Sequence, residues 1–245
     1  MEVRFLGTSH GRPDNGRHCS STMIEMGDSI YLVDAGAPVT DCLFFLGKDI
    51  TKIKGIFITH VHSDHLDGLL FLLNTIVGRR ADAKFKVFLP NEELHKIIIS
   101  YVETLSHTQF PIDKIEFTEP TEGEIFSDQN ITVEYFMTKH IEKSYGLVIK
   151  GEGKALVFTG DMSGGLRGED FPEYAINNHT DLVVCEMAHF EMSDLEKYIE
   201  KLDTEKLCIN HINRLSKYDD VKRVNDSKKY SFPIIAVNDN DLIEI

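Results

Sequence analysis

The chain has few cysteines, no long apolar run and a shortage of basic residues, and each shortage excludes a class of protein. Only four cysteines occur in 245 residues. They stand singly, without the close pairs of a zinc knuckle or the density of a disulfide scaffold. We therefore expect reduced, mostly buried thiols at Cys19, Cys42, Cys185 and Cys208.

The longest apolar stretch, residues 66–77, is too short and too interrupted to span a bilayer. The opening Met-Glu-Val-Arg-Phe-Leu-Gly lacks the basic segment and apolar core of a signal peptide. These features predict a cytoplasmic protein that has no membrane partner.

Lys and Arg number 26 against 40 Asp and Glu, which gives a formal net charge of −14 at pH 7. A protein that binds a long polyanion usually displays a basic surface, because phosphate neutralisation supplies much of the affinity. We therefore expect no long nucleic acid as partner. A small anionic substrate remains compatible with this charge, because bound divalent ions would offset the acidic field locally.

The length suits one large domain, and a hydrophobic content of 42% is ordinary for a globular protein. We expect a single domain over residues 1–245, in which strands and helices recur in both halves. The patterning predicts strands at 2–6, 21–26, 29–34, 55–59, 84–89, 115–118, 131–137, 145–150, 155–159, 182–185, 206–210, 234–237 and 242–245. It predicts helices at 39–46, 66–77, 92–105, 194–202 and 219–227.

Residues 60–65, His-Val-His-Ser-Asp-His, place four metal-ligand side chains within six positions. Alternate residues of a strand share a face, so His60, His62 and Asp64 are expected to lie together as the strand ends. His65 then falls at the turn into a helix. Imidazole and carboxylate groups that converge at the rim of a sheet suit zinc or a similar divalent ion.

Three further ligand-type residues come just beyond predicted strands, namely His140, Asp161 and His211. Each alone would fit a residue at the surface or at the edge of the core. Their shared placement after strands instead favours a common metal site with residues 60–65.

The order of FLGTS (5–9), DAG (34–36), HVHSDH (60–65), KH (139–140) before SYG (144–146), FTGD (158–161) and NH (210–211) resembles the metallo-β-lactamase superfamily. The likeness extends over the full length and is greatest to the ribonuclease Z and small phosphodiesterase branch. It implies an α+β fold, the αββα four-layer sandwich, in which two mixed sheets pack together with helices on the outer faces.

The resemblance also implies a dinuclear site. One ion would be held by His60, His62 and His140, the second by Asp64, His65 and His211, and Asp161 would bridge them. The donor types suit Zn²⁺, with Mn²⁺ or iron as alternatives. Asp34 would orient a ligand histidine, or alternatively cap a turn.

The resemblance further implies that His189, with Glu186 as its acidic partner, assists proton transfer to the leaving group. The alternative is a plain surface histidine. Asp64 would bind metal and also direct the proton of the nucleophile. His10, Arg12, Arg17 and His18 in the first loop are candidates to line the cleft, where arginine could hold a phosphate oxygen, or are solvated loop residues.

These assignments predict a metal-dependent hydrolase, a phosphodiesterase that cleaves a small or nucleotide phosphodiester through a metal-bridging hydroxide. The alternatives are a ribonuclease Z-like RNA endonuclease, an acyl-bond hydrolase such as a lactonase, thioesterase or β-lactamase, and a binding protein without turnover. Ribonuclease Z enzymes usually carry a basic, glycine-rich arm, and nothing in this sequence matches it. The sequence leaves the oligomeric state open and is compatible with a homodimer, in which a partner subunit can wall the cleft.

Overall fold

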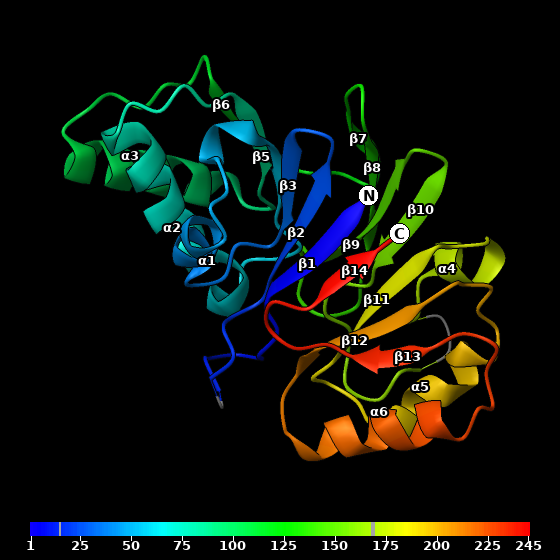
Figure 1. The fold of residues 1–245 in the computed structure, drawn as a ribbon. Coiled ribbons are helices and arrows are strands. Elements are labelled where there is room, and N and C mark those ends of the chain that lie inside the picture. Colours follow the sequence, from blue (N-terminus) through cyan, green and yellow to red (C-terminus); the bar gives the residue numbers. More distant parts are fainter. Residues whose placement is uncertain (15, 168–169) are drawn as a thin grey trace. The chain divides into compact units, whose positions relative to one another are not determined.

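The computed structural model describes residues 1–14, 16–167 and 170–245, and Figure 1 shows its elements. The chain divides into two compact units. Unit 1 comprises Met1–Gly7, Gly11–Pro120 and Asp239–Glu244, and unit 2 comprises Thr8–His10, Thr121–Asn238 and Ile245. The single domain over residues 1–245 stays a prediction.

The described part of unit 1 holds a seven-stranded mixed sheet in the order β14-β1-β2-β3-β4-β5-β6. Strands β14 to β3 pair antiparallel and strands β3 to β6 pair parallel. The bounds are β1 Glu2–Gly7, β2 Ser21–Met26, β3 Ser29–Val33, β4 Ile53–Phe57, β5 Phe85–Phe88, β6 Ile115–Thr118 and β14 Leu242–Glu244. Gly27, at φ 57°, turns the β2–β3 hairpin, since this backbone conformation costs glycine little.

The helices of unit 1 are α1 Val39–Phe45, the 3-10 helix η1 Ile50–Lys52, α2 Ser63–Gly78 and α3 Glu92–Ser106. The apolar stripe of α2, Leu69, Leu72, Leu73 and Ile76, follows helical spacing. This stripe belongs to the same buried cluster as Ile56 of β4, so one face of α2 is fixed against the sheet. The packing holds the first turn of α2 beside the end of β4.

The described part of unit 2 holds a second seven-stranded sheet in the order β13-β12-β11-β10-β9-β8-β7. Strands β7 to β10 pair antiparallel and strands β10 to β13 pair parallel. The bounds are β7 Gly123–Ser127, β8 Thr132–Met137, β9 Tyr145–Gly151, β10 Lys154–Phe158, β11 Leu182–Met187, β12 Leu207–Ile212 and β13 Ile234–Ala236. The helices are α4 Glu173–Asn177, α5 Met192–Ile199 and α6 Ser216–Asp226.

Strand directions in unit 2 place several segment ends at one edge of the sheet. Strands β8 and β10 are both antiparallel to β9, so they run the same way, and β11 and β12 are parallel to β10. The residues that follow β8, β10 and β11, and the last residues of β12, therefore come to the same edge. This edge carries the ligand-type side chains of unit 2.

Most predicted elements are present, with ends shifted by a few residues. The sequence patterns missed β7, α4 and η1. Strand β7 pairs only with β8 among the described strands, and its side chains are exposed or half-buried, so its sequence lacks an alternating apolar pattern. Helix α4 has five residues, too few to show helical periodicity.

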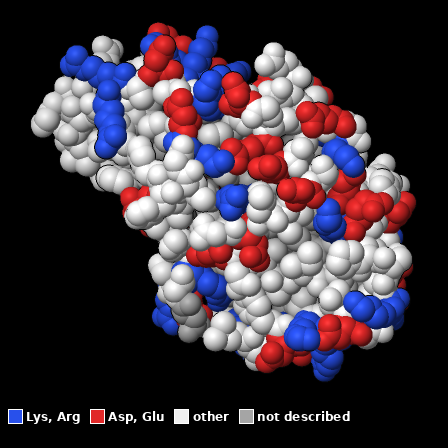
Figure 2. Space-filling model, viewed as in Figure 1, with Lys and Arg blue, Asp and Glu red and all other residues white. Residues whose placement is uncertain are grey.

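None of the described helices has the length and apolar character needed to cross a membrane. On the face drawn in Figure 2, Lys and Arg side chains lie among Asp and Glu side chains, without a continuous basic strip among the described residues. The four cysteines are free and buried, as the sequence predicts. The cytoplasmic location stays a prediction.

Candidate active site

The ligand-type residues of unit 1 lie where β4 gives way to α2. Strand β4 ends at Phe57, His62 is the N-cap of α2, and Asp64 and His65 lie in the first helical turn. The prediction that His60, His62 and Asp64 share the face of one extended strand is therefore wrong. The leucine stripe favours a helix that extends towards Ser63. The Asp64 carboxylate in the first turn stabilises this end, because it interacts favourably with the positive end of the helix dipole.

The side chains of His60 and His62 nevertheless converge. Nε2 of His60 is 3.0 Å from Nδ1 of His62, and His60 is fully buried. Nε2 of His65 lies 3.7 Å from Oδ2 of Asp64, which also accepts the backbone N–H of Gly11 at 2.6 Å. The two pairs form the unit 1 ligand group, defined as His60, His62, Asp64 and His65.

Asp34 is tied to this group through His65. Its carboxylate accepts hydrogen bonds from the N–H and Oγ1–H of Thr59, and its Oδ2 lies 2.7 Å from Nδ1 of His65. A carboxylate only accepts, so Nδ1 of His65 carries a proton, and in the neutral imidazole Nε2 then keeps its lone pair. That is the tautomer a metal ligand needs.

The loop that carries Asp34 packs closely on α2. The backbone N–H of Ala35 donates to the carbonyl of His65 at 2.8 Å. A Cβ atom on Gly68 would lie 2.7 Å from the carbonyl oxygens of Ala35 and Gly36, so glycine is required there for this approach. The contact fixes the distance between Asp34 and the first turn of α2.

The unit 2 ligand group, defined as His140, Asp161 and His211, gathers at the shared edge of the second sheet. Oδ2 of Asp161 lies 3.3 Å from Nε2 of His211 and 3.8 Å from Nε2 of His140. Asp161 and His211 are buried. The three residues are far apart in sequence, and parallel strand ends bring them together.

A bulge aims His211 at Asp161. In the β11–β12 pairing, Glu186 is opposite Asn210 and Met187 is opposite Ile212, so His211 is the extra residue. Its φ of 51° is left-handed. Such a bulge bends the strand and redirects one side chain, here towards the carboxylate that follows β10.

The pair Glu186 and His189 lies next to this group. Oε1 of Glu186 is 3.0 Å from Nδ1 of His189, and that nitrogen is 3.8 Å from Oδ2 of Asp161. The buried Glu186 carboxylate also accepts the backbone N–H groups of Met162, Ala188 and His189. These bonds lock the carboxylate in place, and the carboxylate in turn orients the imidazole.

His10 lies closer to the ligand-type residues than its sequence context suggested. Its Nδ1 is 3.0 Å from Nε2 of His211, and its ring meets the rings of His189 and His211 edge-on. His10, Asp161 and His189 each offer one ligand atom within 4.8 Å of the others. The bridge between Ser9 and Ile212 sets this position, a tertiary contact without a sequence signal.

Two of the other first-loop candidates, Arg17 and His18, have partners in unit 1. Arg17 pairs with Asp14 at 3.5 Å, and Arg12 is exposed. His18 is bound to Asp239, whose Oδ2 accepts the backbone N–H at 2.6 Å and lies 3.2 Å from Nδ1. Their roles as substrate contacts stay predictions.

The spacing of the donors within each unit fits a divalent ion. Two ligands of a tetrahedral zinc, each about 2.0–2.2 Å from the ion, lie roughly 3.3–3.6 Å apart. The pairs His60–His62 at 3.0 Å, Asp161–His211 at 3.3 Å and Asp161–His140 at 3.8 Å lie within about 0.3 Å of this range. Neutral imidazoles with few carboxylates are a donor set that zinc accepts readily.

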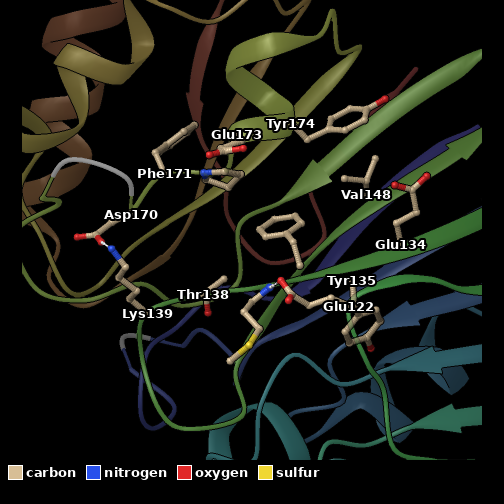
Figure 3. A pocket seen from close by; sticks show the side chains of 13 residues that line it. Glu122, Glu134, Tyr135, Thr138, Lys139, Val148, Asp170, Phe171, Glu173 and Tyr174 are labelled. Carbon is tan, nitrogen blue, oxygen red and sulfur yellow. Dashed lines mark hydrogen bonds and ion pairs between the residues drawn. The ribbon is translucent and has the colours of Figure 1, made fainter.

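A pocket of about 340 Å³ in unit 2 reaches Lys139, the residue before His140 (Figure 3). Its wall carries the carboxylates of Glu122, Glu134, Asp170 and Glu173. Lys139 pairs with Asp170 at 2.8 Å. Burial alone would raise the pKa of the Asp170 carboxyl. Hydrogen bonds from Lys139 and from the backbone N–H of Arg167 outweigh burial, so the pKa of this carboxyl is lowered. Such an acidic pocket does not suit a phosphate.

The fold and the clustered imidazole and carboxylate donors define a metal-binding protein of the metallo-β-lactamase fold. The short form of human tRNase Z aligns with a TM-score of 0.77 at 20% identity, covering 100% of this chain and 99% of that one. The metallo-β-lactamase fold protein YhfI of Bacillus subtilis aligns with a TM-score of 0.78 at 16% identity and 99% coverage of both chains. This likeness confirms the α+β sandwich predicted from the sequence.

The sequence profile of the anti-Pycsar protein Apyc1 family matches residues 1–232, and the chain belongs to this family. Ribonuclease Z of Bacillus mycoides is 30% identical over 149 residues, which are 60% of this chain and 48% of that protein. The chain thus spans about half the length of the curated relatives it matches. These similarities confirm the predicted resemblance to the ribonuclease Z branch.

Proposed function

We propose that the protein is a metal-dependent phosphodiesterase that uses two divalent ions and acts on a small or nucleotide phosphodiester. The observation that carries the proposal is the Glu186–His189 pair beside Asp161. A metal ligand and an oriented imidazole lie together, and hydrolysis of an ester with a poor leaving group needs both. The names of the relatives support this bond type, because ribonuclease Z acts on RNA, a phosphodiester polymer.

The ligand assignment follows the superfamily resemblance. His60, His62 and His140 would hold one ion, Asp64, His65 and His211 the other, and Asp161 would bridge. Bound zinc would supply a water of lowered pKa and a positive charge to stabilise the phosphoryl oxygens. Manganese or iron would supply the same chemistry, and the number and identity of the ions belong to the proposal.

His189 would hold the proton that the departing oxygen receives. Glu186 accepts from Nδ1 and stabilises the protonated imidazole, which leaves Nε2 as the donor to the leaving group. Asp64 would hold the proton of the attacking water, in the position that the resemblance gives it. Asp34 would keep His65 in the tautomer that binds metal.

The charge of the chain supports a small substrate. A net charge of −14 opposes binding of a long polyanion, whereas a single phosphate needs only the local field of the ions. A second candidate is RNA cleavage of the ribonuclease Z type, favoured by the 33% identity to ribonuclease Z of Listeria monocytogenes over 160 residues.

The test is a substrate panel with protein loaded with zinc or manganese. It contains a chromogenic phosphodiester, cyclic nucleotides, a precursor transfer RNA, a lactone and a thioester. We expect turnover of the chromogenic ester and of at least one cyclic nucleotide. Brisk lactone or thioester cleavage without phosphodiester turnover would contradict the proposal, and cleavage of the RNA alone would replace it with the second candidate.

A further inference from the structure

Lys217, the second residue of α6, is a lysine with almost no exposure to solvent. Its side chain is 1% exposed, and its Nζ donates to the carbonyl oxygens of Met187 at 2.6 Å, Phe190 at 2.7 Å and Ala188 at 3.3 Å. An ammonium group has three N–H donors, so these carbonyls can occupy all of them. Burying a charge is costly unless it is hydrogen-bonded, so this arrangement needs all three acceptors.

The three carbonyls belong to residues 187–190, the last residue of β11 and the start of the loop that presents His189. From the other side, the carboxylate of Glu186 accepts the backbone N–H groups of Ala188 and His189. The loop is therefore held by a buried cation at its C=O groups and by a buried anion at its N–H groups. Nδ2 of Asn213 adds a further bond to the Ala188 carbonyl at 2.7 Å.

We infer that Lys217 is a positioning residue that fixes the 187–190 loop and thereby sets the direction of the His189 imidazole. The inference rests on the proposed function, in which His189 transfers a proton to the leaving group. Lys217 touches neither substrate nor ligand in this scheme and acts only through backbone carbonyls. Misplacing a reacting group by about 1 Å can cost roughly 10²-fold in rate, so a firmly held loop has a kinetic consequence.

Nearby carboxylates offset part of the cost of burying the Lys217 charge. Burial lowers the pKa of Lys217, while the nearby carboxylates of Glu191 and Glu186 oppose that shift. The Glu191 carboxylate lies 3.9 Å from Nζ, and the cationic neighbour is Arg214. The negative charge of Asp194 also raises the pKa of Lys217. The carboxylates and the three carbonyls together favour the charged form.

The test compares Lys217→Met with Lys222→Met in the metal-loaded full chain. Methionine keeps the length of the side chain and removes the donors, whereas Lys222 lies on the exposed face of the same helix and pairs with Asp226. We measure turnover of a p-nitrophenyl phosphodiester, whose leaving group needs no acid, and of a cyclic nucleotide, whose alkoxide does. Metal content and the nitrogen chemical shifts of the His189 ring against pH are recorded for each protein.

We expect Lys217→Met to lower cyclic nucleotide turnover by about 10²-fold and p-nitrophenyl ester turnover by only about three-fold, with unchanged metal content. The His189 resonances should shift or broaden, and Lys222→Met should match the wild type. Equal losses with both esters and unaltered His189 resonances would overturn the inference.

Two further measurements keep the result decisive. If Lys217→Met does not fold, Asn213→Ala releases one bond to the Ala188 carbonyl and should give the same leaving-group pattern on a smaller scale; equal losses there would also overturn the inference. If the wild type hydrolyses no phosphodiester, the proposed function fails, but the His189 resonances and the amide exchange of residues 187–190 still report whether the lysine holds the loop.

Discussion

The two ligand groups are built in different ways. In unit 1, four ligand-type residues occupy six consecutive positions at the start of one helix, and Asp34 is their main outside support. In unit 2, the three ligands come from three separate segments and meet only because β8, β10 and β12 run the same way. The first group depends on local chain geometry, and the second depends on the sheet and on the bulge at His211.

This difference determines how each group should respond to change. A local group needs an outside partner to select tautomers, whereas a dispersed group needs a central anionic group around which its imidazoles can gather. In unit 2 that group is the carboxylate of Asp161, which His140, His189 and His211 all approach within 4 Å. The largest effects are therefore expected at Asp161 and smaller ones at Asp34.

Asp161→Ala should cause the largest loss. Without the carboxylate, the unit 2 imidazoles lose the anionic group that they share, and phosphodiester turnover should fall by more than the roughly 10²–10⁴-fold typical of losing one acid–base group. Metal content by atomic emission and turnover should fall together. Retention of full metal content and half of the activity would show that unit 2 does not depend on this residue.

His189→Ala should come next. Turnover of an ester with an alkoxide leaving group should fall by about 10²–10³-fold, because no acid protonates the departing oxygen. The matched control is His179→Ala, which removes an exposed histidine paired with Asp203. Metal content should stay constant in both variants, and a loss of metal from the His189 variant would make the residue a ligand instead.

Asp34→Asn should have an intermediate effect confined to metal affinity. Asparagine tolerates the φ of 60° at this position, but its amide would face Nδ1 of His65 and favour the wrong tautomer. Loss of such an outer partner typically costs about 10–100-fold in metal affinity. Isothermal titration with zinc measures the change, and activity at saturating zinc should return to near the wild-type value.

Thiol alkylation should have the smallest effect. Burial, followed by nearby carboxylates, raises the pKa of Cys19 and of Cys42 to about 11. Thiolate is the reactive form, so iodoacetamide at about pH 8 should leave both residues unmodified in the native protein, with activity changed by less than about two-fold. Mass spectrometry before and after unfolding distinguishes the two states, and rapid native labelling would contradict the burial.

The sequence identified the local group more readily than its geometry. Six consecutive residues, His60 to His65, carried the metal signal without knowledge of any other part of the chain. Their conformation was predicted wrongly, because the leucine stripe of α2 starts the helix at Ser63 and overrides the period of a strand. Local sequence propensity predicts the boundary between two elements poorly when the second element begins within a few residues of the first.

The dispersed group shows the opposite pattern. The sequence predicted the three strands that end near His140, Asp161 and His211, and so predicted that these residues lie close together. The bulge that directs the His211 side chain has no signature in the sequence. The contacts of Lys217 could not be predicted from the sequence for a related reason. Its partners are backbone carbonyls 27–30 positions away, and every residue type has a carbonyl.

The pairing of β14 with β1 has a consequence for synthesis on the ribosome. Glu2 is opposite Glu244, so the two strands are separated by about 240 positions of chain. At a synthesis rate of about 5–20 residues per second, roughly 12–50 s pass between the synthesis of β1 and that of β14. During this time β1 is an unpaired edge of the sheet. Unit 1 therefore completes its sheet only when residues 242–244 emerge, after nearly all of unit 2 has been made.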